Sequence, residues 1–195
     1  MNYLAHAFLS GADKQILVGN FIADAVKGKA VDNYPDEIRR GIILHRFIDE
    51  YTDHHAMHRA SRSKLTSRYR HYAGVLVDIY YDHYLAKNWQ QYAEISLDKF
   101  TTGVYQTLTG YQDILPEKIQ YMLKYMVPQN WLLNYAHLSG IERVLKGMAN
   151  RAKFDSQMQH GVEDLELNYT DFEEEFTMFF PDLQQFVDEK IQSII

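Results

Sequence analysis

The chain has 195 residues, a length that fits one domain, so we expect a single domain over residues 1–195. It contains no cysteine, which excludes disulfide bonds and any cysteine-ligated zinc or iron–sulfur site. Its net charge of −6 argues against bulk nucleic-acid binding, because domains with that function are usually basic.

Apolar residues recur at three- to four-residue spacing along most of the chain, a pattern that predicts helices. Three of the prolines precede acidic residues, as is typical of helix starts. No segment alternates strictly between apolar and polar residues as a strand would. We therefore expect an all-α, compact multi-helix bundle, with helices near residues 13–26, 35–51, 56–69, 74–88, 97–109, 116–126, 140–151, 160–179 and from Pro181 onward.

The start of the chain, residues 1–15, lacks the basic residues and continuous apolar run of a secretion signal. No segment reaches the roughly 18 apolar residues that a membrane-spanning helix requires. We therefore expect a cytoplasmic protein without a membrane span. The sequence carries no signal of an oligomeric state.

Charge is unevenly distributed along the chain. Residues 54–77 contain no Asp or Glu, whereas residues 155–189 contain eleven acids and no Lys or Arg. This asymmetry predicts either an anionic partner at the basic segment or two solvated helix faces. The basic residues of the first segment are Arg59, Arg62, Lys64, Arg68 and Arg70.

The unusual feature of the sequence is a set of His and Asp residues within apolar segments. His45 and Asp49 are four residues apart, so both side chains lie on one face of one helix. Asp78 and Asp82 share this spacing. Two such helices side by side would bring an imidazole and several carboxylates to one point, which is how helical bundles build metal sites. Imidazole suits transition metals, and carboxylate-rich sites suit Mn²⁺ or Mg²⁺.

Three aspartates have apolar neighbours in the sequence: Asp24, Asp49 and Asp78. An unpaired carboxylate is costly to bury, so we expect a positive charge near each of them. Either Arg46 or a divalent cation could supply it, and we favour the cation.

The remaining candidates have plain structural interpretations as well. A single histidine in an apolar segment, such as His6, is more often a hydrogen-bonded core residue than a ligand. Asp82 and His83 are adjacent, and adjacent helical residues point about 100° apart. We therefore expect at most one of these two residues to bind the metal directly. The other would support that ligand from behind or face the substrate.

Short segments spread over nearly the whole chain carry a resemblance to a known family. They are MNYLAH at 1–6, GNFIAD at 19–24, GI at 41–42, HRFID at 45–49, TD at 52–53, DIYYDHYL at 78–85, NW at 88–89, WL at 131–132 and GMA at 147–149 with Arg151. In this order, they resemble those of the acyl carrier protein phosphodiesterases. That family is described as distantly similar to the HD-domain phosphohydrolases, which are all-helical and hold metals with His and Asp. In this chain His45 is followed by Arg46 instead of Asp, and the one adjacent pair is the reversed Asp82–His83.

The resemblance implies hydrolysis of the phosphodiester between 4′-phosphopantetheine and a serine of holo acyl carrier protein. The products would be apo carrier protein and 4′-phosphopantetheine. It implies a divalent metal cofactor, manganese first and magnesium as an alternative. The expected metal ligands are Asp24, His45, Asp49 and Asp78, and the expected catalytic residues are His6, Asp82, His83 and, for contact with phosphate, Arg46.

The resemblance also implies an acidic protein substrate, which the basic segment would attract. The expected docking residues are Arg59, Arg62, Lys64 and Arg68. Two other functions remain open at this point. One is an HD-type phosphohydrolase acting on nucleotides or small phosphoesters at the same metal site. The other is a non-enzymatic helical adaptor in which the His and Asp residues are structural.

Overall fold

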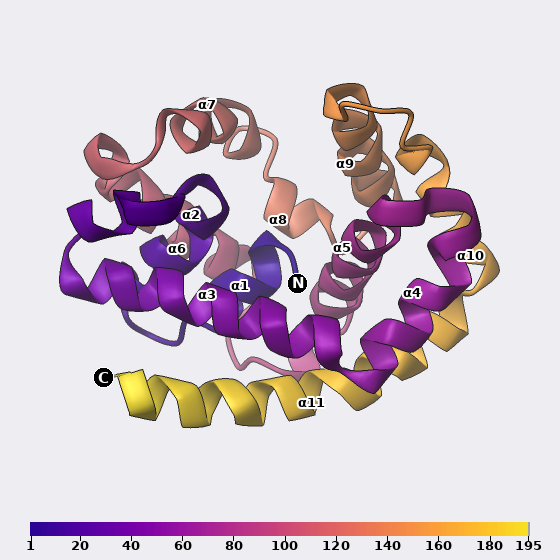
Figure 1. Cartoon of the computed structure of the whole chain (residues 1–195), viewed down its shortest axis with the longest axis horizontal. Helices are drawn as coiled ribbons and strands as arrows, with labels where there is room; N and C mark the ends of the chain where they lie inside the picture. Colours follow the sequence, from indigo (N-terminus) through magenta and orange to yellow (C-terminus); the bar gives the residue numbers. More distant parts are fainter. Residues whose placement is uncertain (195) are drawn as a thin grey trace.

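Helices make up all the regular structure of residues 1–194, which are the residues that the computed structural model describes (Figure 1). No strand occurs in this part of the chain, so the all-α prediction is confirmed. The α-helices are α1 (Tyr3–Phe8), α2 (Lys14–Ile22), α3 (Asp36–His54), α4 (Ala56–Tyr69), α5 (Ala73–Lys87), α6 (Leu97–Gly110), α7 (Glu117–Met126), α8 (Trp131–Asn134), α9 (Leu138–Arg151), α10 (Gly161–Leu167) and α11 (Tyr169–Ile194).

Short 3₁₀ turns join several of these helices. Among residues 1–194, no helix is both long enough and apolar enough to cross a membrane. The 3₁₀ turns are η1 (Ala23–Ala25), η2 (Gly28–Asn33), η3 (Arg70–Tyr72), η4 (Trp89–Gln91), η5 (Gln112–Ile114) and η6 (Met158–His160).

The C-terminal helices differ from the prediction. We expected one helix over 160–179 and a new one from Pro181. Instead, the first helix is interrupted at Asn168, and α11 continues through Pro181. Asn168 ends α10 by donating both its backbone N–H and its side-chain amide to the carbonyl of Asp164. A proline inside a helix removes one backbone donor. Here the apolar face continues on both sides of it, with Phe180 and Leu183 fully buried, and this packing holds the helix together.

Helices α2 and α3 cross in backbone contact. A Cβ atom on Gly19 would collide with the carbonyl of Ile38, and one on Gly41 would collide with the carbonyl of Ile16. Only glycine allows two helices to approach so closely. This contact sets the position of Asn20, beside Gly19, relative to His45, one turn after Gly41.

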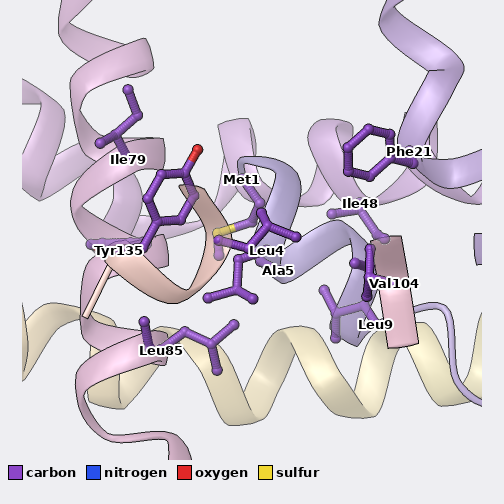
Figure 2. Packing of buried hydrophobic residues seen from close by; sticks show 14 of the residues in the cluster. Met1, Leu4, Ala5, Leu9, Phe21, Ile48, Ile79, Leu85, Val104 and Tyr135 are labelled. Carbon is purple, nitrogen blue, oxygen red and sulfur yellow. The ribbon is translucent and has the colours of Figure 1, made fainter. Parts of the chain in front are cut away.

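Helix α1 lies inside the molecule. Figure 2 shows Leu4 and Ala5 of α1 packed among Ile48, Leu85 and Tyr135, and all five side chains are buried. A helix of six residues is too short to be stable alone, so its position depends on this packing and on bonds to its ends. That position matters because α1 carries His6.

The basic segment packs against the acidic one, since α4 contacts α11. Lys64 Nζ lies 2.8 Å from Glu175, and Arg68 Nη1 lies 2.7 Å from Asp164. Arg59 and Arg62 make no ion pair with any other residue of 1–194. The charge asymmetry therefore serves partly to join α4 to α10 and α11, and two of the four predicted docking residues already have partners within the chain.

Candidate metal centre

Two histidines and one aspartate from α1 and α3 meet in the interior. The Nε2 atom of His6 lies 3.1 Å from Oδ1 of Asp49, and Nε2 of His45 lies 3.1 Å from Oδ2 of the same carboxylate. The two imidazole rings stack, with centroids 3.9 Å apart and an interplanar angle of 17°. One carboxylate thus faces the Nε2 atoms of two stacked imidazoles, both of which are buried.

Asn20 determines how both rings are oriented. Its side-chain amide donates to the carbonyl of His6 at 2.9 Å and to Oγ of Ser10 at 3.0 Å, which identifies Oδ1 as an acceptor. Nδ1–H of His6 donates to that Oδ1 at 2.8 Å, and Nδ1–H of His45 donates to the backbone carbonyl of Asn20 at 2.8 Å. In its neutral form, each ring therefore presents an unprotonated Nε2 to Asp49.

This arrangement brings hydrogen-bond acceptors together. An unprotonated Nε2 and a carboxylate oxygen are both acceptors, so neither can bond to the other without a proton or a cation between them. His45 Nε2 has no hydrogen-bond partner within residues 1–194, although Asp49 lies 3.1 Å and Asp24 lies 3.4 Å away. One ligand atom each from His6, His45 and Asp49 lies within 4.8 Å of the other two. Two imidazole nitrogens and a carboxylate oxygen at this spacing are suitable ligand atoms for a divalent cation.

In this cluster, burial and the neighbouring charges shift the pKa values in opposite directions. Burial and the stacked His45 lower the pKa of His6 and favour its neutral form. Burial also opposes a charge on His45, but Asp24 and Asp49 outweigh it and raise the pKa of His45 to about 9. Burial would raise the pKa of Asp49, yet the two histidines outweigh it and hold that carboxyl well below its usual range. A bound cation would take the place of the proton on His45.

Asp24 forms the open edge of this site. Its side chain comes from the turn η1, just after α2, and is 71% exposed, whereas that of Asp49 is 42% exposed. The exposure of Asp24 differs from the burial that its apolar neighbours in the sequence predicted. The neighbouring His45, whose Nε2 lies 3.4 Å from Oδ1, lowers the pKa of Asp24 and keeps it ionised. The cluster is therefore open to solvent on the side of its two carboxylates.

Asp82 fixes the start of α1. Its buried carboxylate accepts the backbone N–H groups of Asn2 at 3.3 Å, Leu4 at 2.8 Å and Ala5 at 3.2 Å. Burial raises its pKa to about 7, although the three donors act in the opposite direction. Unpaired N–H groups at a helix start need such an acceptor. Asp82 thus positions the helix that carries His6.

Asp78 lies beside the cluster in a separate group. Its Oδ1 accepts from the amino group of Met1 at 3.0 Å and from Nε2 of His58 at 3.1 Å. The same amino group lies 3.8 Å from Oδ1 of Asp49 and so connects the two groups. His58 was not among the predicted residues, because its spacing in the basic segment does not distinguish it from a surface histidine.

The structure does not bring His83 or Arg46 into the cluster. Nδ1–H of His83 donates to the carbonyl of Tyr135 at 2.7 Å, and the hydroxyl of Tyr169 donates to Nε2 at 2.7 Å. This follows from the turn of about 100° between adjacent helical residues, since Asp82 faces α1. Arg46 is exposed and makes no hydrogen bond or ion pair within residues 1–194, so it neutralises none of the aspartates.

Replacing Asn20 with Ala should weaken metal binding by about 10- to 100-fold, because outer partners of metal-binding histidines contribute on that scale. The change removes the acceptor for His6 Nδ1–H and two further hydrogen bonds. Titration with Mn²⁺ measures the effect, and Lys14→Ala, at the exposed start of the same helix, is the matched control. Equal Mn²⁺ affinity in the two variants would contradict the orienting role of Asn20.

Known proteins match this chain over nearly its full length. The sequence profile of the family described as acyl carrier protein phosphodiesterase matches residues 1–183. A protein of that name from Serratia proteamaculans is 34% identical over 186 residues, which are 95% of this chain and 96% of the relative. One from Photorhabdus laumondii is 34% identical over 191 residues, 97% and 96% of the two chains. One from Yersinia enterocolitica is 33% identical over 182 residues, 93% and 94% of the two chains.

No solved structure matches the chain significantly. The sequence relatives and the profile agree in one assignment, and the matched region includes His6, His45 and Asp49. The chain therefore belongs to the acyl carrier protein phosphodiesterase family.

Proposed function

We propose that this protein hydrolyses the phosphodiester between 4′-phosphopantetheine and a serine of holo acyl carrier protein, with Mn²⁺ or Mg²⁺ held by His6, His45 and Asp49. The main support is that hydrogen-bond acceptors face one another in this cluster. Nε2 of His45 has no hydrogen-bond partner among the described residues, although it lies beside the carboxylates of Asp24 and Asp49. The names of the relatives supply the substrate class.

A divalent cation at this position would supply positive charge for phosphate oxygens and would make water more acidic. The chain provides the rest of the chemistry. Asn20 holds both histidines with Nε2 toward the site. Asp24, ionised and exposed, accepts a proton from the attacking water and returns it to the serine oxygen as that group leaves. Water adds to phosphorus and the bond from phosphorus to the serine oxygen breaks, which yields a serine hydroxyl and a phosphate monoester.

Intact-protein mass spectrometry of holo acyl carrier protein tests this reaction. We expect the protein with Mn²⁺ to remove the phosphopantetheine mass, and EDTA to prevent the loss. A parallel assay with nucleotides and small phosphodiesters addresses the HD-type alternative, which shares this site. Cleavage of those compounds with no change in holo carrier protein would refute the proposed substrate. An intact holo carrier protein with no cleavage of any substrate would favour the adaptor.

Arg59 and Arg62 are the free cations of the proposed docking surface on α4. They follow His58, which bonds to Asp78, and so lie on a helix that reaches the neighbourhood of the metal site. Replacing both with Ala should raise KM for holo carrier protein about three- to tenfold at low salt and weaken its salt dependence, because exposed charges act mainly on association. Lys64→Ala is the control, since Lys64 already pairs with Glu175. An unchanged KM at low salt would contradict this docking surface.

A further inference from the structure

A small cavity lies between α8 and α9. Its volume is about 90 Å³, and no acidic residue lines it. A space of this size suits a single small group and excludes a folded partner. Its walls include Trp131 and Asn134 from α8, and Gly140, Arg143, Gly147 and Arg151 from α9.

The sequence of α9 creates this space. Gly140, Arg143, Gly147 and Arg151 are spaced by three and four residues, so they form one stripe along the helix. A Cβ atom on Gly140 would collide with the carbonyl of Asn134, so only glycine lets α8 approach α9 at this point. A Cβ atom on Gly147 would lie 3.4 Å from Nη1 of Arg151. The two glycines therefore bring the walls together at one end and leave room beside Arg151 at the other.

The guanidinium groups are the free donors of this cavity. Neither Arg143 nor Arg151 makes a hydrogen bond or an ion pair within residues 1–194, whereas Lys146 on the same helix pairs with Glu142 at 2.6 Å. The polar side chains of the α8 wall already have hydrogen-bond partners within the protein. Nε1–H of Trp131 donates to Gln129 at 3.1 Å, and the amide of Asn134 donates to backbone carbonyls at 2.8 and 3.0 Å. Two unpaired guanidinium groups beside a small space fit an oxyanion.

The end of α8 places this cavity next to the candidate metal centre. Tyr135 directly follows the wall residue Asn134, and Figure 2 shows it packed beside Met1 and Leu4. The amino group of Met1 lies 3.8 Å from Oδ1 of Asp49, and α1, which carries His6, begins two residues after Met1. In Figure 1, α8 lies next to the N-terminus and α9 stands above α5.

We propose that Arg151 and Arg143 form the phosphate-binding side of the active site and hold the phosphate of the 4′-phosphopantetheine group opposite the metal ligands. The proposal rests on the function proposed above and adds the residues that bind the anion. A bidentate guanidinium contact would offset the negative charge on the phosphate oxygens during attack by water. It would also retain the product, a phosphate monoester with more negative charge than the diester.

Calorimetric titration of the metal-free protein in EDTA tests this site without turnover. The probes are 4′-phosphopantetheine and pantetheine, which lacks the phosphate. We expect Arg151→Gln to weaken binding of 4′-phosphopantetheine by about 10- to 100-fold, as loss of a charged hydrogen bond does, and Arg143→Gln to weaken it less. Pantetheine binding should be the same in all variants. Arg151→Lys should restore part of the affinity, and Lys146→Gln on the same helix is the control.

Equal affinity for 4′-phosphopantetheine in wild type, Arg151→Gln and Lys146→Gln would overturn the proposal. It would also fail if the arginine variants lost affinity for apo carrier protein alone, because the arginines would then bind acidic side chains of the carrier. Thermal melts show whether each variant is folded. The function proposed above is tested separately, by cleavage of holo carrier protein. Arginine-dependent binding of the phosphate compound without any cleavage would refute that function and leave the anion site in place.

Discussion

Asp49→Asn should lower kcat/KM for holo carrier protein by about 10³-fold, since a metal ion contributes several kcal/mol to stabilising a charged transition state and each tenfold corresponds to about 1.4 kcal/mol. The substitution keeps the size of the side chain but removes the charge that faces Nε2 of both histidines at 3.1 Å. Bound Mn²⁺ per chain, measured by elemental analysis, should fall together with activity.

Asp53→Asn is the matched control for this prediction. Asp53 lies one turn after Asp49 on α3, is exposed, and makes no hydrogen bond or ion pair within the described residues. We expect it to keep full metal content and activity. If Asp49→Asn were as active as Asp53→Asn, or retained its metal while losing activity, Asp49 would not be a metal ligand.

Asp82→Ala should destabilise the protein by about 3 kcal/mol, because it leaves buried N–H groups of α1 without their acceptor and removes buried volume. The carboxylate accepts the N–H groups of Asn2, Leu4 and Ala5, and no other side chain of residues 1–194 bonds to those of Leu4 and Ala5. Urea denaturation measures the loss. Since α1 carries His6, Mn²⁺ affinity of the folded variant should fall about 10- to 100-fold as well.

Asp82→Asn separates the two parts of that effect. The amide keeps the volume and one acceptor, so we expect a smaller loss of stability, about 1–2 kcal/mol. Full stability and full Mn²⁺ affinity in Asp82→Ala would show that α1 is held by its apolar packing alone, and the anchoring role of Asp82 would be wrong.

Helical periodicity predicted most of the fold correctly. The expected helix over 56–69 has the bounds of α4, the one over 74–88 is shifted by one residue from α5, and the one over 97–109 ends one residue before α6 does. One error was the break at Asn168, which the periodicity did not predict. Another occurred at Pro181, where the local preference for a helix start was outweighed by the buried aromatic face of α11. Sequence patterns describe local preference, whereas burial of a long apolar face is a property of the whole molecule.

The candidate site was only partly predictable. The spacing of His45 and Asp49 was sufficient to place them on one face of α3, where the structure has them. The orienting role of Asn20 was not predicted, because it depends on contacts with two other helices. Its signal in the sequence is a single amide inside the apolar segment 16–23, next to a glycine. The close crossing at Gly19 and Gly41 converts that signal into an orienting residue.

The roles of Asp82 and Asp78 depended equally on tertiary contacts. Both lie on α5 at the spacing that predicted a shared site, yet one binds the start of α1 and the other binds His58 and the amino group of Met1. Spacing fixes the face of a helix but not the partner that packs there. The unpaired Nε2 atom of His45 marks the proposed metal position, and it becomes visible only when three elements are assembled.

Anomalous diffraction at the manganese edge, from crystals soaked in Mn²⁺, shows whether His6, His45 and Asp49 hold the metal. We expect one strong peak bounded by Nε2 of His6, Nε2 of His45 and the carboxylate of Asp49, with Asp24 at its open side. A peak beside Asp78 and His58 instead, or no peak at a Mn²⁺ concentration that supports hydrolysis, would contradict it.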